Sequence, residues 1–264
     1  MKPLAEEAHR FGLRVCGYIS AFMTASKAVE RGYDEITHLN MLALNFFGDT
    51  IDTRIPLRFS VPAKQTATLD LQGQEMANFI QLLKQKNIAV DPTLLVFEDL
   101  FTAREKVVAP KFVPIVNRFP ASFQRFIKAG GGGIPVPEGM DETYKQSFAA
   151  FKKITKLLYD NGIRILAGTD DIAGFGLQRE LELYVEAGIP AEKVLQMATW
   201  NAAVYTGRQK EFGDLSVGKK ADLVLVEGNP VKNISNIRNT ILVLANGRIY
   251  NPVALYKAIS VKPM

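Results

Sequence analysis

Short apolar segments alternate with amphipathic helical patterns along most of this chain, and this alternation limits the folds that it can adopt. The apolar segments predict strands at residues 13–19, 34–39, 88–94 and 163–167. The helical patterns lie at residues 3–11, 24–31, 71–87, 141–160, 177–187 and 191–205. Because parallel strands need crossover connections, strands separated by helices predict an α/β fold with a parallel sheet.

The predicted strands amount to half of a (β/α)₈ barrel, a fold whose sites lie at the carboxyl ends of the strands. The irregular stretches 41–69 and 97–140 are then expected to be loops at those ends. Within the second stretch, the run Gly130–Gly133 is not followed by the Gly-Lys-Ser/Thr of a phosphate-binding loop, so it predicts a flexible loop. The phenylalanines at 46–47 and 97–101 either line an apolar pocket or belong to the core.

The pattern changes after Gly207, where turn-like sequences separate short strands. Residues 223–226 form an apolar run typical of a buried strand. Residues 241–244 and 248–250 flank Asn246–Gly247, a pair that predicts a hairpin turn.

We therefore expect two domains, an α/β part at residues 1–207 and a small β-rich tail at residues 208–264. Two or three strands are only marginally stable alone. The tail thus needs a partner sheet that the chain itself does not obviously provide.

Composition and charge exclude several classes of protein. The 264 residues carry a net charge of +5, but the basic residues are scattered, which argues against nucleic-acid binding. No apolar run approaches the roughly 20 residues of a membrane span. The N-terminal helix lacks the apolar core of a signal peptide, so a cytoplasmic location is expected if residue 1 is the true start. The single cysteine, Cys16, excludes an internal disulfide and is expected in the core.

The chain contains only two histidines, His9 and His38, which limits any histidine-based metal centre. His38 ends a predicted strand and is either a metal ligand or a hydrogen-bonded histidine at a strand end. Asp170 follows Gly168–Thr169 and is either a metal ligand that accepts a proton or a helix N-cap. Asp91 either faces the mouth of the barrel or serves a turn.

Several motifs resemble the metal-dependent amidohydrolase superfamily, in its imidazolonepropionase and Xaa-Pro dipeptidase-like branch. They occur in the order of that family and cover nearly the whole chain. They are Glu35–His38, Ala167–Asp170, Glu180–Gly188, Ala198–Ala203, Gly213–Val224 and Glu227–Pro230. The resemblance implies that the chain is the C-terminal half of an amidohydrolase, comprising strands five to eight of a partial TIM-type barrel and the tail sheet.

The same resemblance implies a function and its residues. It implies hydrolysis of amide or other non-aromatic C–N bonds of a small molecule, with a divalent metal, zinc, as cofactor. His38 and Asp170 correspond to metal ligands, and Asp170 also to the catalytic proton acceptor. Tyr18 stands at a ligand position of the fifth strand, and Gln178 stands where relatives often show histidine. These two residues are expected to contact substrate.

The sequence also departs from the family. The His-x-His pair of the first strand is absent, and a tyrosine is a poor metal ligand because its phenol has a pKa near ~10. We therefore expect a truncated chain that holds no stoichiometric metal and hydrolyses little by itself. It is expected to associate with itself, to pair with a separate N-terminal half, or to be poorly soluble. The alternatives are a non-catalytic remnant that binds or assembles, and an unrelated α/β binding module.

Overall fold

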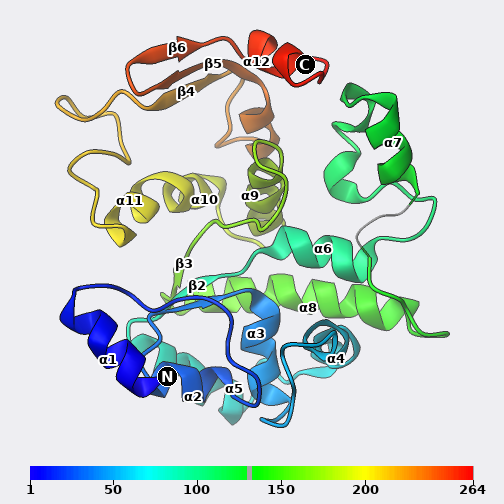
Figure 1. The fold of residues 1–264 in the computed structure, drawn as a ribbon, viewed down its shortest axis with the longest axis vertical. Coiled ribbons are helices and arrows are strands. Elements are labelled where there is room, and N and C mark those ends of the chain that lie inside the picture. The colour runs from blue at the N-terminus through cyan, green and yellow to red at the C-terminus, as the bar shows by residue number, and fades with distance from the viewer. Residues whose placement is uncertain (130–132, 264) are drawn as a thin grey trace. The chain divides into compact units, whose positions relative to one another are not determined.

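The computed structural model describes residues 1–129 and 133–263, which form two compact units (Figure 1). The first unit contains Met1–Thr102 and Gly133–Asp170, and the second contains Ala103–Gly132 and Asp171–Met264. The fold is mixed α/β, as predicted. The predicted domain boundary at residues 207 and 208 falls inside the second unit and stays a prediction. Most of the glycine run at 130–133 lies outside the described residues.

A parallel sheet lies at the centre of the first unit. Its strands are β1 (Glu35–Thr37), β2 (Ala89–Asp91) and β3 (Arg164–Ile165), in that order. Ile36 pairs with Val90, and Val90 pairs with Ile165, so the carboxyl ends of the three strands meet at one edge. The parallel pairing confirms the prediction from the alternation of strands and helices.

The segment 13–19 does not form the predicted strand. The Val15 carbonyl accepts one hydrogen bond from the Asp34 N–H at 2.8 Å, but the Val15 N–H donates to the Asp34 carboxylate at 2.7 Å. Gly17 then turns the backbone with φ +122°, a region that side chains disfavour. The Asp34 carboxylate therefore accepts the hydrogen bond that a backbone carbonyl of a neighbouring strand would accept in a sheet. Cys16, which was expected in the core, is exposed.

Helices surround this sheet and fill much of the stretches expected to be irregular. The helical elements of the first unit are α1 (Lys2–Arg10), α2 (Ala25–Glu30), α3 (Leu39–Ala43), η1 (Leu44–Phe46), α4 (Leu57–Gln65), η2 (Thr66–Thr68), α5 (Gln74–Gln85), α6 (Leu94–Thr102) and α8 (Asp141–Asp160). Figure 1 shows the long helix α8 beside α6. Phe97 and Phe101 of α6 pack on Phe151 with ring centroids 5.2 and 5.3 Å away, so these phenylalanines belong to the core.

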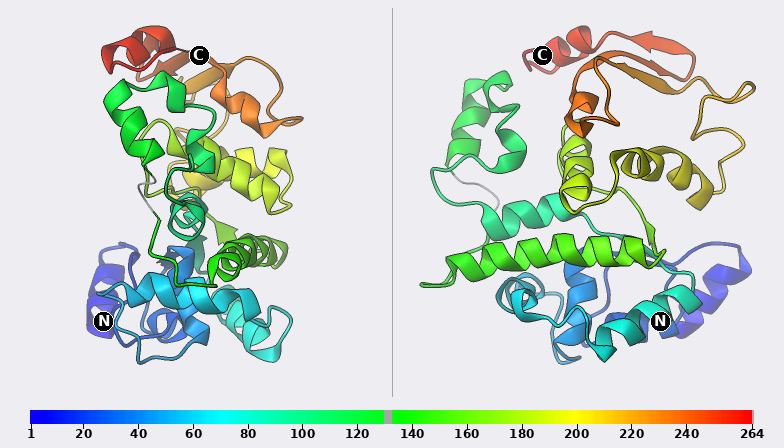
Figure 2. Two further views of the ribbon diagram at one scale, coloured as in Figure 1. Left: turned by 90° about the vertical axis from the view of Figure 1, so that its right-hand side faces the viewer. Right: turned by 180° about the vertical axis from the view of Figure 1, so that it is seen from behind.

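The second unit combines helices with an antiparallel sheet. Its helical elements are η3 (Pro110–Phe112), η4 (Val116–Arg118), α7 (Ala121–Lys128), α9 (Gly176–Glu186), α10 (Ala191–Gln196), the π-helical turn η5 (Met197–Asn201), α11 (Ala202–Tyr205), η6 (Ile234–Arg238) and α12 (Pro252–Ala258). The π-turn interrupts the helix predicted at 191–205. Figure 2 shows α12 at the same end of this unit as the sheet.

The tail sheet has the predicted strands. They are β4 (Leu223–Val226), β5 (Thr240–Ala245) and β6 (Arg248–Tyr250), paired antiparallel in that order. Asn246 and Gly247 have φ of 51° and 73°, as a two-residue hairpin with two left-handed residues requires. Apolar side chains of this sheet remain exposed, among them Val224 at 55% and Ile249 at 70%. None of the helices within residues 1–129 and 133–263 combines the length and apolar character needed to cross a membrane.

Candidate functional site

Three polar residues follow the three strands of the parallel sheet. His38 comes directly after β1, Asp91 ends β2, and Asp170 lies in the turn after β3. The His38 N–H donates to the Asp91 carbonyl at 2.8 Å, so the ladder between β1 and β2 continues up to the histidine. The register of the sheet thus brings these side chains to the edge where α/β proteins hold their sites.

His38 is buried, with 5% of its surface exposed, and its backbone has φ +71°. Its Nδ1 lies 2.8 Å from Thr93 Oγ1, and that hydroxyl donates its proton to the Pro92 carbonyl at 2.8 Å. The hydroxyl has only one proton, so it accepts from the imidazole, and Nδ1 carries the hydrogen. The Nε2 lone pair therefore faces the site, where Asp170 Oδ2 lies 3.7 Å away.

Burial is the main cause that lowers the pKa of His38. The charge of Asp170 acts in the opposite direction, and the charge of Arg58 lowers the pKa further. The imidazole is thus neutral at neutral pH, which is the form that can accept a hydrogen bond or bind a metal.

Asp170 has φ +49° and a side chain that is 55% exposed. The residue at the N-cap of α9 is Phe175, so Asp170 does not serve as its N-cap. Neither does Asp171, whose carboxylate accepts from the Ile172 N–H at 2.6 Å and pairs with Lys111. The structure therefore excludes the capping interpretation and leaves the Asp170 carboxylate open to solvent beside His38.

Asp91 joins β2 to the turn after β3. Its Oδ1 accepts a hydrogen bond from the Gly168 N–H at 2.9 Å, and a Cβ at Gly168 would lie only 2.0 Å from Oδ2. Burial, together with the charges of Glu35 and Asp170, raises the pKa of Asp91 to about 7 against the two backbone hydrogen bonds that lower it. Asp91 thus holds the backbone that leads to Asp170, a role that sequence patterns left open.

Tyr18 lies against the histidine. Its ring centroid is 4.7 Å from that of His38, and the residue is 49% exposed. Burial of the hydroxyl, followed by the charge of Asp170, raises the pKa of Tyr18, so the phenol stays protonated at neutral pH. The Tyr33 hydroxyl donates to the Tyr18 carbonyl at 3.0 Å and fixes the backbone there. Tyr18 therefore lies beside His38, and its predicted contact with substrate stays a prediction.

Gln178 lies on α9 in the second unit, whereas Tyr18, His38 and Asp170 lie in the first. Its Oε1 is buried and has no hydrogen-bond partner among the described residues. The predicted role of Gln178 in binding substrate stays a prediction.

Sequence reasoning missed two residues of the site. Thr93 fixes the tautomer of His38, although it is 55 positions away. Arg58 lies beside Tyr18, with its guanidinium carbon 5.3 Å from the ring centroid. Its position on α4, in a stretch expected to be a loop, provided no signal of this proximity.

The described residues of this site provide fewer metal ligands than a zinc ion needs. A catalytic zinc site uses about three protein ligands and an open position. Among residues 1–129 and 133–263, no group of three or more His, Cys, Asp or Glu side chains is arranged to hold one ion. His38 Nε2 and Asp170 offer two donors, and Asp91 is engaged with the Gly168 backbone. The described residues alone do not fit a complete zinc site.

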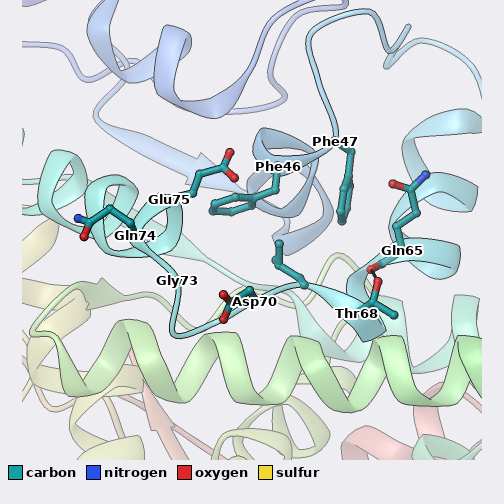
Figure 3. A pocket seen from close by; sticks show the side chains of 9 residues that line it. Phe46, Phe47, Gln65, Thr68, Asp70, Gly73, Gln74 and Glu75 are labelled. Atoms are coloured by element: carbon teal, nitrogen blue, oxygen red, sulfur yellow. Dashed lines mark hydrogen bonds between the residues drawn. The ribbon is translucent and has the colours of Figure 1, made fainter.

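A separate pocket of about 330 Å³ in the first unit contains none of these residues. Figure 3 shows the rings of Phe46 and Phe47 above the loop that carries Asp70 and Gly73. Phe46 also packs edge-on against Phe79, with centroids 5.5 Å apart. Phe46 and Phe47 therefore line a pocket, but its lining also contains carboxylates.

Comparisons with known proteins bear on this site. A model of the amidohydrolase family matches residues 148–250. An imidazolonepropionase of Thermoanaerobacter pseudethanolicus is 30% identical over 105 residues, which are 38% of this chain and 24% of that protein. A 5-methylthioadenosine/S-adenosylhomocysteine deaminase of Moorella thermoacetica is 54% identical over 39 residues, 15% of this chain and 9% of that protein.

Solved structures match over nearly the whole chain. The structure of a Xaa-Pro dipeptidase with bound methionine matches with a TM-score of 0.58 at 21% identity. The match covers 95% of this chain and 48% of the dipeptidase chain. The bottromycin amidohydrolase has a TM-score of 0.66 at 20% identity, covering 98% of this chain and 56% of its own. The chain therefore spans about half the length of these structures.

Proposed function

Because this chain belongs to the amidohydrolase superfamily, we propose that it takes part in hydrolysing an amide or another non-aromatic C–N bond of a small molecule. The main support is the approach of His38 Nε2 to the Asp170 carboxylate, at 3.7 Å, where the parallel strands end. One group is a neutral base and the other a solvent-open carboxylate. Together they are suited to activating water.

The proposed chemistry uses these two side chains. His38 Nε2 accepts a hydrogen bond from the attacking water and orients it. As the water oxygen bonds to the carbonyl carbon, its other proton passes to the Asp170 carboxylate. That proton is then delivered to the leaving nitrogen as the C–N bond breaks, which gives an acid and an amine. Tyr18 and Gln178 are proposed to contact the substrate.

The family generally uses a divalent metal, and zinc is the ion we propose for the whole enzyme. His38 and Asp170 would be its ligands in this chain. Because two ligands are fewer than such a site uses, zinc needs a further donor from outside the described residues. The proton transfers above are therefore assigned to the side chains of the chain itself.

The test measures hydrolysis of a panel of N-acyl amines and dipeptides by the purified chain, with its zinc content determined by mass spectrometry. We expect slow hydrolysis above the buffer rate that falls at least ~10-fold in Asp170→Asn. Asp160→Asn, an exposed aspartate at the end of α8, is the matched control and should keep the rate. A wild-type rate equal to that of the buffer would contradict the proposal.

The alternative is a chain that binds or assembles without catalysis. Two observations favour it: the described residues offer only His38 and Asp170 as metal ligands, and the Tyr18 ring packs against His38 at a tilt of 49°. Such a chain would show the buffer rate for every substrate in wild type and in Asp170→Asn alike.

We also propose that the tail of this chain is covered by a second polypeptide, either another copy or a separate N-terminal half. A groove of about 920 Å³ in the second unit lies between α11 and the tail sheet. Apolar side chains from both line it, including Ala202, Val224 and Val243. An exposed apolar surface of this kind usually marks an interface.

A further inference from the structure

The pocket of about 330 Å³ in the first unit combines two aromatic rings with two carboxylates. Phe46 ends η1 and Phe47 follows it, Asp70 lies two residues after η2, and Glu75 is the second residue of α5. Figure 3 shows Glu75 next to Phe46, and Asp70 on the loop below the rings. Small-molecule sites occupy roughly 300–1,000 Å³, so the pocket has room for a small ligand.

Packing fixes the aromatic part of this pocket. Phe46 packs edge-on against Phe79 of α5, with ring centroids 5.5 Å apart and an angle of 87° between the rings. Phe79 is itself buried, so it provides a fixed support. Phe46 and Phe47 are only half-buried, and part of each ring therefore remains available to a ligand.

The Asp70 carboxylate is also held in place. Its Oδ1 accepts a hydrogen bond from the Gln72 N–H at 3.0 Å. A Cβ at Gly73 would lie only 2.6 Å from Oδ2, so glycine at this position leaves room for the carboxylate. A carboxylate can accept about four hydrogen bonds, and Asp70 therefore keeps acceptor capacity for a ligand.

The charge of the pocket is negative. Its lining contains no Lys, Arg or His, and neither Asp70 nor Glu75 forms an ion pair within residues 1–129 and 133–263. The N-terminus of α5, where Glu75 lies, contributes the equivalent of roughly half a positive charge. This is too little to offset both carboxylates, so the pocket attracts cations and repels anions.

The lining favours an organic cation over a metal ion. Calcium takes roughly six to eight oxygen ligands, and magnesium needs an octahedral set. The described part of the chain has no group of three or more His, Cys, Asp or Glu side chains that could hold an ion. Phenylalanine rings are not metal ligands, but their faces attract an ammonium group.

We propose that this pocket binds a small organic ammonium ion, with its alkyl groups on Phe46 and Phe47 and its charge balanced by Asp70 and Glu75. The inference goes beyond the proposed hydrolysis and does not depend on it, because the pocket contains none of the proposed reacting groups. A neutral molecule of the same shape gains the apolar contact with the rings but no stabilisation from the carboxylates.

The test compares choline with 3,3-dimethylbutan-1-ol, in which carbon replaces the charged nitrogen, by NMR titration of the full chain. The backbone amide resonances of residues 69–75 are followed, together with NOEs between the ligand methyl protons and the rings of Phe46 and Phe47. We expect choline to bind at least ~10-fold more tightly than the alcohol and to contact both rings. Added salt should weaken the binding of choline and leave that of the alcohol unchanged.

Variants of the lining separate the charge from the rings. Glu75→Gln and Asp70→Asn keep the shape of the side chain, and each should weaken choline binding about 3-fold. Phe47→Leu keeps an apolar side chain without a ring and should weaken it by a similar factor. Glu142→Gln is the matched control, because Glu142 is the second residue of α8 as Glu75 is of α5, but lies outside the lining. It should bind choline as wild type does.

Thermal unfolding of each variant confirms that it is folded. Equal binding of choline and the alcohol by wild type would overturn the inference, and so would the absence of choline binding. Choline binding that shifts only resonances outside residues 69–75 would overturn it too, as would unchanged affinity in both Glu75→Gln and Asp70→Asn.

Discussion

Two side-chain hydrogen bonds organise the site at the scale of single residues. Thr93 holds His38 in one tautomer, and Asp91 holds the backbone at Gly168, two residues before Asp170. Neither Thr93 nor Asp91 needs to touch the substrate for these effects. Thr93 fixes the His38 imidazole, and Asp91 fixes the backbone that leads to Asp170. Substitutions of Thr93 or Asp91 are therefore expected to act by displacing His38 or Asp170.

Gly168→Ala should destabilise the first unit, because the new Cβ would lie 2.0 Å from the Asp91 carboxylate. We expect a loss of about 1–3 kcal/mol in the free energy of unfolding, measured by urea denaturation. The Asp91→Ala background removes the clashing atoms, so Gly168→Ala should cost much less there. Equal costs in the two backgrounds would show that the contact is not responsible.

The pKa of Asp91 predicts a pH dependence of stability. The pKa of Asp91 is 3.8 in the unfolded chain and is raised to about 7 in the folded chain. At a pH between these two values, the folded state therefore holds a proton on Asp91 that the unfolded state has released. Stability from this residue is therefore present below pH ~4, falls as the pH rises towards ~7, and changes no further above that. Urea denaturation across this range should show the fall in wild type and lack it in Asp91→Asn. An identical profile for the two proteins would contradict this assignment.

At the scale of elements, the second unit depends on an ion pair between α9 and η6. Arg238 binds the Glu182 carboxylate through two hydrogen bonds of 2.7 and 2.9 Å, and both side chains are about a tenth exposed. These hydrogen bonds and the charge of Arg238 lower the pKa of Glu182 against the effect of its burial. The pair thus ties a helix to the segment that precedes β5.

Arg238→Met should leave the Glu182 carboxylate poorly compensated. We expect a loss of about 3 kcal/mol, the low end for a broken buried pair, because Arg179 remains 3.4 Å from Glu182. Arg208→Met removes an exposed arginine, 3.5 Å from Glu211, and should cost less than about 1 kcal/mol. The free energy of unfolding of both variants is measured by urea denaturation. Similar losses in Arg238→Met and Arg208→Met would show that the buried ion pair stabilises the fold no more than the exposed one.

At the scale of the whole molecule, the exposed tail sheet predicts association. Sedimentation velocity of the purified chain should show a mass that increases with concentration. Val224→Lys places a charge in the groove and should reduce self-association at least ~10-fold, since an unpaired charge opposes burial. Val107→Lys, at an exposed position outside the groove lining, is the control. A monomer at all concentrations would contradict self-association and favour a different partner.

Sequence patterns predicted much of the fold because their signals are local. The periodicity of residues 71–87 and 141–160 indicated α5 and α8, and Asn246–Gly247 indicated the hairpin. Local patterns failed at residues 13–19, where an apolar run reads as a strand. There the carboxylate of Asp34, which lies in another segment, accepts the hydrogen bond from the Val15 N–H.

By itself, the sequence determined the order of helices and strands, the resemblance to amidohydrolases, and His38 and Asp170 as candidates at strand ends. These properties depend on neighbours along the chain and on recognisable motifs. Only the tertiary structure decided that Thr93 fixes His38, that Asp91 meets Gly168, and that the Nε of Arg58 is buried without a hydrogen-bond partner among the described residues. The two hydrogen bonds join residues 55 and 77 positions apart, so they exist only once the register of the parallel sheet has brought the strand ends together.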